Sequence, residues 1–244
     1  MIKLVVFDLD ETLLNPVEMY KIYVALRTAT IAARLGISLD KAREKVAGLK
    51  RELPIGTTEA VFDALGIGKE VWREKMLEVD PRKFVEPDPS VKGVLDSINV
   101  SKVLLTGLPV EQMLEELEAA GILDSFDLLV GWEKGGEPPK HSSKTWESIF
   151  ARCGVRPQDV VAVGNEVSTD LPKELGVWTV LVGNDPFADA DTIRKKVDIQ
   201  IDSILKLPAV VEKIGQMQAQ LQHAESIEPS FGRAKGVHLD LLNL

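Results

Sequence analysis

The sequence has almost no cysteine and no long hydrophobic run. Cys153 is the one cysteine in 244 residues, so no internal disulfide can form and we expect a cytoplasmic protein in a reducing compartment. No apolar stretch approaches the roughly 18 residues that cross a membrane. The first run, Leu4–Phe7, leads directly into acidic residues and not into a small-residue cleavage site. We therefore expect neither a signal peptide nor a membrane partner.

Positive charge is also scarce. The 29 Lys and Arg residues are outnumbered by 38 Asp and Glu residues, which gives a formal net charge of −9. Such a surface repels phosphate backbones unless basic residues cluster locally, and the four tryptophans are not interleaved with basic residues. Nucleic acid is therefore not an expected partner. No paired spacing of cysteine and histidine predicts a zinc site.

The chain does contain a series of short aliphatic runs, each followed by turn residues and a helical pattern. Runs that are apolar at successive positions are typical of strands buried on both faces. Strands that alternate with helices predict right-handed crossovers and an α/β fold with a doubly wound, Rossmann-like parallel sheet. The predicted strands are Leu4–Phe7, Val103–Leu105, Leu128–Val130, Val160–Val163, Thr179–Val182 and Ile199–Ile201, and the predicted helices lie near 110–120, 143–153, 169–175, 189–196 and 207–221.

The alternation is interrupted between residues 16 and 90, where the pattern is helical throughout and prolines and glycines supply the breaks. The predicted helices of this segment are Lys21–Leu35, Leu39–Leu53, Thr58–Leu65 and Glu70–Leu77. We predict an all-α insertion at residues 16–85 in a core made of residues 1–15 and 86–222. A C-terminal extension at 223–244 ends in an apolar tail, which we expect to pack back on the core. The alternative is an interface, such as that of a homodimer.

Acidic side chains follow the first predicted strand directly. Asp8 and Asp10 are two residues apart on an extended chain, so both side chains face the same side, just past the strand end. Two unpaired carboxylates at one point repel each other and need a cation or a proton. A hard divalent ion such as Mg²⁺ takes carboxylate and carbonyl oxygens as ligands. Acids at this place can also simply cap or solvate the next turn.

The motifs and their order resemble the haloacid dehalogenase superfamily. Its first motif, DxDx[T/V] after the first strand, matches Asp8, Asp10 and Thr12 in FDLDETLL. Its second motif matches Thr106 in VLLTG, and its fourth corresponds to VVAVGNEVSTDL. The resemblance covers roughly residues 1–214. It implies the α/β core predicted above, with the helical insertion as a cap that closes over the site and selects the leaving group.

The third motif of the family is a lysine ahead of a helix, and two lysines compete for this place. Lys144 lies within a predicted helix and is displaced by about 200° from Trp146 on its apolar face, so it points to solvent. Lys140 precedes the helix in a loop, and the segment KHSSKTW matches the family pattern with Ser143 and Trp146 at the proline and phenylalanine positions. We therefore assign Lys140.

The resemblance implies phosphoryl transfer through a covalent aspartyl-phosphate. Asp8 would be the nucleophile, and Asp10 would protonate the leaving oxygen and then activate water. Thr106 and the backbone N–H groups of Leu9 and Gly107 would hold the phosphoryl oxygens. Lys140 would neutralise charge on the nucleophile and on the phosphoryl group. An aspartate at the place of Asp10 marks the phosphatase branch, because the dehalogenases themselves do not carry it.

The fourth motif departs from the family pattern. The family usually has an aspartate directly after the glycine, and here Asn165 follows Gly164. The predicted ligands of Mg²⁺ are therefore Asp8, Asp10, Asn165 and Asp170. An amide oxygen can bind Mg²⁺ but brings no charge. Glu166 or Asp170 could compensate, and Asp170 could instead stabilise a helix start. Weak metal binding, altered metal choice and loss of activity are all consistent with this substitution.

The expected function is a Mg²⁺-dependent phosphatase that acts on a small phosphorylated metabolite. The first motif, DLDETL, is more similar to the pyrimidine 5′-nucleotidase branch than to sugar phosphatases, whose motif more often has glycine at the place of Glu11. Asn15, just after the first motif, and Arg51 of the insertion are candidate substrate-binding residues, with Glu18 and Lys50 as alternatives. One rival function is a non-catalytic phosphate-binding or partner-binding module, and another is a phosphotransferase or mutase.

Overall fold

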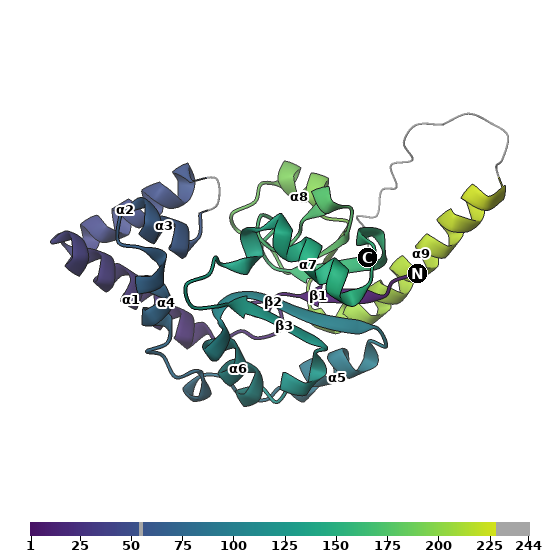
Figure 1. Ribbon diagram of the computed structural model, residues 1–244, viewed down its shortest axis with the longest axis horizontal. Helices are drawn as coiled ribbons and strands as arrows, with labels where there is room; N and C mark the ends of the chain where they lie inside the picture. The colour runs from purple at the N-terminus through teal and green to yellow at the C-terminus, as the bar shows by residue number, and fades with distance from the viewer. Residues whose placement is uncertain (54–55, 228–244) are drawn as a thin grey trace.

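A computed structural model describes residues 1–53 and 56–227 (Figure 1). Most of the predicted C-terminal extension, residues 228–244 with its apolar tail, lies outside the described residues. The described part of the extension continues the last helix, α9 (Leu207–Ile227).

The core is one parallel sheet of six strands in the order β3-β2-β1-β4-β5-β6. The strands are β1 (Leu4–Phe7), β2 (Ser101–Pro109), β3 (Leu128–Trp132), β4 (Val160–Gly164), β5 (Trp178–Val182) and β6 (Ile199–Ile201). Each contains one of the predicted runs, so the predicted doubly wound α/β fold is confirmed. Because β1 lies between β2 and β4, the segments that leave these three strands start side by side.

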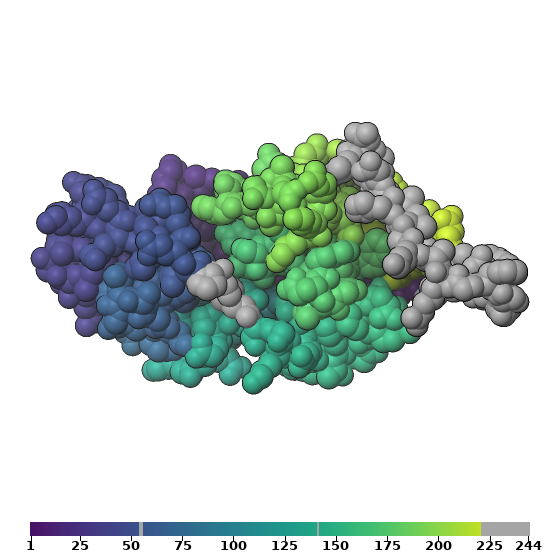
Figure 2. Space-filling view, turned by 90° about the horizontal axis from the view of Figure 1, so that it is seen from above, coloured from purple at the N-terminus to yellow at the C-terminus, as the bar shows by residue number. Residues whose placement is uncertain are grey.

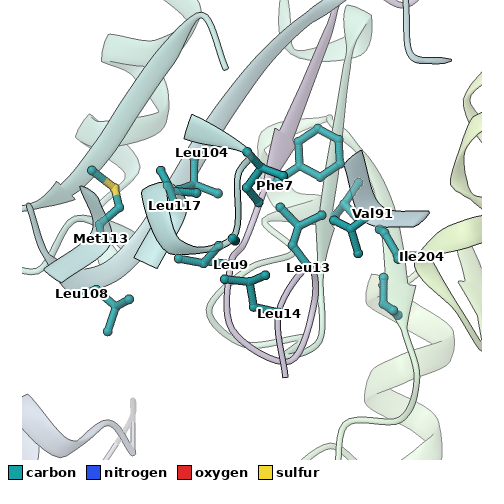
Figure 3. Packing of buried hydrophobic residues seen from close by; sticks show 14 of the residues in the cluster. Phe7, Leu9, Leu13, Leu14, Val91, Leu104, Leu108, Met113, Leu117 and Ile204 are labelled. Atoms are coloured by element: carbon teal, nitrogen blue, oxygen red, sulfur yellow. The ribbon is translucent and has the colours of Figure 1, made fainter. Parts of the chain in front are cut away.

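Alternate residues of the central strand enter two separate apolar cores, one on each face of the sheet. Phe7 packs with residues of α5 (Pro89–Ser97), α6 (Val110–Ala119) and α9. Figure 3 shows this side, with Phe7 and Leu104 near Leu117 and Met113. Val6 packs on the other face, below α7 (Ser143–Cys153) and near α8 (Ala190–Lys196). The sheet is thus covered on both faces, as its uninterrupted apolar strands require.

Two details of the helix prediction were wrong. Residues 169–175 do not form an α-helix but turns followed by a single 3-10 turn at Lys173–Leu175, because Pro172 lacks an N–H and disfavours a helical conformation in the residue before it. Helix α5 was not predicted, although Pro89 occupies its first turn, where proline is tolerated. The other 3-10 turns lie at Pro81–Lys83, Leu123–Ser125, Pro139–His141, Pro157–Asp159 and Ile204–Lys206.

Residues between β1 and β2 form the predicted four-helix insertion, hereafter the helical insertion. Its helices are α1 (Val17–Leu35), α2 (Leu39–Glu52), α3 (Thr58–Ala64) and α4 (Lys69–Met76). The space-filling view shows them packed against one end of the core (Figure 2). Its apolar residues, Phe62 and Trp72 among them, belong to the same cluster as Phe7. The insertion is therefore held on the core by continuous apolar packing.

Arg73 of α4 joins the helical insertion to the core by polar contacts. Its buried guanidinium pairs with Glu111 of α6 and donates to the Trp132 carbonyl at 3.4 Å. The neighbouring Glu70 accepts a hydrogen bond from the Gly135 N–H at 3.2 Å. Helix α4 thus contacts the segment that leaves β3 and leads to Lys140.

Within the described residues, no single helix has the length and apolar composition to cross a membrane. Helices α1 and α2 reach that length and composition only when taken together, across a bend of 106°.

The Arg73–Glu111 pair generates a prediction about stability, because Arg73 is 3% exposed and Glu111 is 57% exposed. Glu111→Gln leaves a buried guanidinium without its carboxylate and should lower the free energy of unfolding by about 1–3 kcal/mol. Arg73→Met leaves a carboxylate that water can solvate, so the loss should be smaller. Denaturant unfolding of both variants measures the two losses. A larger loss of unfolding free energy in Arg73→Met would show that Arg73 stabilises the contact between the helical insertion and the core mainly through its packing.

Candidate active site

The predicted catalytic residues come together at the carboxyl ends of neighbouring strands. Asp8 directly follows β1, Thr106 lies near the end of β2, and Asn165 follows β4. Lys140 lies in the segment between β3 and α7. This edge of the sheet faces the helical insertion (Figure 1).

Asp8 is held rigidly at the strand end. Its backbone N–H donates to the Val163 carbonyl at 2.9 Å, and its side chain is 3% exposed. The Thr12 hydroxyl donates to its Oδ2 at 2.9 Å, and Lys140 Nζ lies 2.6 Å from its Oδ1. Burial and the charge of Asp170 raise the pKa of Asp8, while Lys140 opposes the rise. The carboxylate therefore depends on nearby positive charge to stay ionised.

Lys140 bridges two carboxylates that come from different strands. Its Nζ lies 2.6 Å from Asp8 Oδ1 and 2.6 Å from Asp170 Oδ1. Burial disfavours the ammonium ion, but Asp170 and Asp8 outweigh this effect and raise the pKa of Lys140. Lys140 is therefore charged at any physiological pH. Lys144 is exposed, as its helical position predicted.

Asp170 binds Lys140 and is not among the residues that line the cavity described below. Besides Lys140, it accepts hydrogen bonds from the Glu166 N–H at 3.0 Å and the Thr169 hydroxyl at 3.0 Å. Its side chain packs directly on Gly164, where an added Cβ would lie 2.2 Å from the Asp170 Cβ. Only glycine at the end of β4 leaves room for this approach. The structure thus gives Asp170 a full set of protein donors.

Asn165 and Asp8 share a hydroxyl. Thr12 Oγ1, which donates to Asp8 Oδ2, also lies 3.3 Å from Asn165 Oδ1. One hydroxyl proton cannot serve both oxygens fully, so these two oxygens are partly unsatisfied. Asn165 Nδ2 donates to Glu11 Oε2 at 3.2 Å. Glu11 itself adopts a left-handed φ of 57°, a conformation in which glycine would be unstrained.

Asp10 faces a buried carboxyl group that the sequence analysis missed. Glu116 of α6 is 0% exposed, and burial together with the charge of Asp10 raises its pKa, so it is protonated at neutral pH. Burial also raises the pKa of Asp10, while hydrogen bonds from Glu116 and Tyr20 oppose the rise. The pKa of Asp10 is therefore closer to neutral pH than that of an ordinary aspartate. Such a pKa suits a group that donates and accepts a proton.

A cavity of about 190 Å³ opens above these residues. Thr106 and Gly107 form one side of it, and Tyr20 of α1 and Thr57 at the start of α3 contribute from the helical insertion. Its lining residues are Asp8, Asp10, Glu11, Tyr20, Thr57, Thr106, Gly107, Leu108, Lys140, Asn165, Glu166 and Thr169. The cavity is therefore lined by four carboxyl groups and one ammonium group. An anionic substrate would be repelled by this excess of negative charge without a further cation.

The donor set fits a hard divalent cation. Asp8, Asp10 and Asn165 offer carboxylate and amide oxygens, which are ligands that Mg²⁺ accepts. Two of these oxygens, on Asp8 and Asn165, compete for one hydroxyl. In the described part of the chain, no three carboxylate, imidazole or thiol groups gather as a metal cluster, and the position after Gly164 is an amide. Asp8, Asp10 and Asn165 therefore fit Mg²⁺, but they supply one negative charge fewer than three carboxylates would.

Not every predicted site residue reaches the cavity. Asn15 and Arg51 are exposed and do not line it. The Leu9 side chain is buried in the apolar core, so only its backbone can face the site. Glu116 and Tyr20 were not predicted. Glu116 interrupts the apolar face of α6 between Met113 and Leu117, and such a charge on a buried face is the one signal that could have identified it.

Comparison with known proteins finds a matching family model and solved structures of the same fold. Residues 2–172 match the family model of the haloacid dehalogenase-like hydrolases. A haloacid dehalogenase-type phosphatase from Thermococcus onnurineus is 24% identical, with a TM-score of 0.62 over 86% of this chain and 98% of its own. A β-phosphoglucomutase from Clostridium difficile is 17% identical, with a TM-score of 0.54 over 90% of this chain and 100% of its own.

A hydrolase structure of the same family from Bacillus subtilis, described as bound to magnesium, is 13% identical, with a TM-score of 0.56 over 86% of this chain and 99% of its own. No curated protein sequence matches this chain. At these identities the solved structures establish the fold, and the family model establishes the family.

The contacts of Lys140 generate a prediction about activity. Lys140→Ala removes the cation between Asp8 and Asp170 and should lower turnover by about 10²–10³-fold, as loss of other preorganised donors does. Lys144→Ala, the matched control from the exposed side of α7, should leave turnover unchanged. Steady-state kinetics on a phosphate ester measures both variants. The reverse ranking would show that the third motif is wrongly assigned.

Glu116 generates a prediction about pH. The pKa of Glu116 is higher in the folded protein than in the unfolded chain. Above the unfolded pKa, folding must therefore take up a proton at Glu116. The free energy of unfolding of the wild type falls as the pH rises from the unfolded pKa toward the folded pKa. Glu116→Gln keeps the size and an N–H donor but cannot ionise. Its stability advantage over wild type should grow between about pH 5 and about pH 8, by up to about 1.4 kcal/mol per pH unit.

Denaturant unfolding of both proteins at several pH values measures this difference. A difference that does not change with pH would contradict a protonated Glu116.

Proposed function

Because this chain belongs to the haloacid dehalogenase-like hydrolase family, we propose that it is a Mg²⁺-dependent phosphatase that hydrolyses a small phosphorylated metabolite. The carrying observation is the buried Asp8, poised at the end of β1 with Lys140 at 2.6 Å and Asp10 two residues on. A nucleophile, a charge-neutralising lysine and a titratable carboxyl thus share one cavity edge.

The proposed reaction runs in two steps on this chain's own residues. An oxygen of the Asp8 carboxylate attacks phosphorus, the bond from phosphorus to the leaving oxygen breaks, and Asp10 gives its proton to that oxygen. Water then attacks the phosphorus of the aspartyl-phosphate while Asp10 takes up its proton. The bond to Asp8 breaks and inorganic phosphate leaves. The raised pKa of Asp10 supports its part in both steps.

The other residues would bind and stabilise the phosphoryl group. Thr106, at 2% exposure, and Gly107 face the cavity and would donate to phosphoryl oxygens. Lys140 would offset the negative charge of Asp8 and the phosphoryl group, and Asp170 would hold Lys140 in place. Mg²⁺ would be held by Asp8, Asp10 and Asn165, and when bound it supplies positive charge to the phosphoryl oxygens.

We extend the proposal to the helical insertion, residues 16–85, as a cap over the core, residues 1–15 and 86–222. Tyr20 and Thr57 reach the cavity from the insertion, so the insertion can select the leaving group. Asn15 and Arg51, which lie outside the cavity lining, would take part only through a change in the position of the cap.

Asn165 supports a second candidate function, a catalytically weak or inactive phosphate-binding protein. The amide contributes no charge to the proposed metal site and already contacts Glu11 and Thr12. A panel of phosphate esters with Mg²⁺ or Mn²⁺ separates the candidates. Turnover supports the phosphatase, binding of phosphate without turnover supports the binding protein, and transfer of phosphate to a second substrate in preference to water supports a mutase.

Substitution of the proposed nucleophile and of the proposed acid–base group should lower turnover to different extents. Asp8→Asn should remove nearly all turnover, because no covalent intermediate can form. Asp10→Asn should lower turnover by about 10²–10⁴-fold, the usual contribution of general acid–base catalysis. Initial rates on the best ester of the panel, with circular dichroism as the control for folding, measure both. An Asp8→Asn variant within about tenfold of wild type would exclude this mechanism.

Asn165→Asp tests the metal site. The two side chains are nearly isosteric, so the added carboxylate acts mainly through its attraction to a dication. Mg²⁺ should bind more tightly by about 1–2 kcal/mol, which is about five- to thirtyfold. Calorimetric titration of wild type, Asn165→Asp and Glu166→Gln measures the affinities. Unchanged binding in Asn165→Asp together with a strong loss in Glu166→Gln would show that Glu166 is the ligand.

A further inference from the structure

The segment that carries Lys140 into the site has little stiffness of its own. It runs from residue 133 to residue 139, and its first part is a turn that contains Gly135 and Gly136, with a left-handed φ of 75° at Gly135. Glycine leaves the backbone more conformational freedom than any other residue. Lys140 nevertheless holds its ammonium group 2.6 Å from each of its two carboxylate partners. Contacts from outside the segment must therefore help to fix its position.

Helix α4 of the helical insertion supplies such contacts. Glu70 accepts a hydrogen bond from the Gly135 N–H at 3.2 Å. Lys69 forms an ion pair with Glu137, and the Lys69 side chain is only 20% exposed. In the part of the chain that the structure describes, no other helix of the insertion makes a hydrogen bond or an ion pair with residues 133–139. Helix α4 thus holds the segment at two points.

Arg73, one turn further along α4, fixes the start of the same segment. Its buried guanidinium donates through Nε to the carbonyl of Trp132, the last residue of β3, at 3.4 Å. The Trp132 indole N–H donates to the Gly136 carbonyl at 3.1 Å and so draws the segment back toward the strand. Residues three and four apart on a helix are neighbours, so Lys69, Glu70 and Arg73 share one face of α4. This face contacts the segment along its first half.

The second half of the segment is stiff. Pro138 and Pro139 follow Glu137 directly, and both prolines are buried. The proline ring fixes φ, and consecutive prolines act as a semi-rigid spacer. Pro139 also begins the 3-10 turn Pro139–His141, which contains Lys140. A displacement of Glu137 is therefore transmitted to Lys140, three residues away, and is not absorbed between them.

The stability of α4 does not explain the Lys69–Glu137 pair. Glu137 is 80% exposed, and ion pairs that water can reach contribute little to the free energy of unfolding. Lys69 is also the first residue of α4, where the helix dipole favours an acidic side chain over a basic one. The helix itself would be better stabilised by a carboxylate at this position. The feature that a lysine adds is its attraction to Glu137.

We propose that Lys69 and Glu70 of α4 are positioning residues for Lys140, because by holding residues 133–137 they keep its ammonium group between its two carboxylates. This inference rests on the proposed phosphatase function, in which Lys140 offsets negative charge at the nucleophile. Neither Lys69 nor Glu70 lines the cavity, so both act on the reaction only through the segment. A displacement of about 1 Å at a catalytic group can lower a rate by about 10²-fold.

Reversal of the Lys69–Glu137 pair tests this role by steady-state kinetics on the best phosphate ester of the panel. Lys69→Glu and Glu137→Lys each place like charges together, and each should lower kcat by about tenfold while KM changes by no more than about twofold. The double variant restores the attraction and should return kcat to within about threefold of wild type. Lys75→Glu is the matched control. It makes the same charge change on the same helix, but its partner Glu78 belongs to the insertion, so kcat should not change.

A double-mutant cycle shows whether the effect passes through Lys140. In a Lys140→Ala background, Lys69→Glu should change kcat by less than about twofold, because no ammonium group is left to position. An equal loss in both backgrounds, with folding confirmed by circular dichroism, would overturn the proposal.

Glu70 is tested by two variants that both remove its charge. Glu70→Gln keeps an acceptor for the Gly135 N–H and should retain the wild-type kcat. Glu70→Met has no acceptor and should lower kcat by about threefold or more. Equal rates in the two variants would contradict a positioning role for Glu70.

Chemical labelling follows the position of Lys140 without any turnover. Its side chain is 15% exposed and lies between two carboxylates, so an amine-acylating reagent should modify it more slowly than the exposed Lys144. Mass spectrometry measures the ratio of labelling at Lys140 to labelling at Lys144. This ratio should rise by at least about fivefold in Lys69→Glu and in Glu137→Lys, and it should return toward the wild-type value in the double variant.

The labelling experiment separates this proposal from the proposed function. If the wild type hydrolyses no ester, the phosphatase proposal fails, and the labelling ratio alone decides whether α4 positions Lys140. If the wild type is an active phosphatase and the labelling ratio is unchanged in both single variants, the positioning role is overturned and the phosphatase stands.

Discussion

An ammonium group held between two buried carboxylates is the contact on which the rest of the site depends. Lys140 reaches Asp8 and Asp170 at equal distances of 2.6 Å, and these three residues come from three separate segments of the sheet edge. Asp8 depends on this nearby cation to stay ionised, because burial raises the pKa of its carboxyl group. The same contact keeps the Asp8 oxygens oriented and anchors the segment between β3 and α7.

Hydrogen-bond donors are distributed unevenly among the carboxylates around this contact. Asp170 is satisfied by Lys140 and by donors of its own turn, whereas Asp8 shares one hydroxyl with Asn165. Asp10 lies beside Glu116, whose raised pKa keeps it protonated at neutral pH. The cavity is therefore acidic toward the core, which suits a cation.

The strands were the most predictable part of the fold. Because parallel strands are buried on both faces, their apolar runs are continuous, and all six were located from the sequence. The helices were less predictable. Pro172 prevented the helix expected at 169–175, and α5, which begins with Pro89, was not predicted. In the site, the choice of Lys140 over Lys144 followed from helical periodicity. Glu116 was missed because it matters only through Asp10, which lies on another element.

The resemblance to the family implied the roles of Thr106, Lys140 and Asn165. Local pattern by itself determined the order of strands and helices, the position of the helical insertion, and the placement of Asp8 and Asp10 at the end of a strand. These properties follow from periodicity and from the geometry of parallel sheets. The tertiary structure alone decided which charges are paired and which are not. Ionisation and pairing depend on distances across elements and on burial, and neither is encoded in the spacing of residues along the chain.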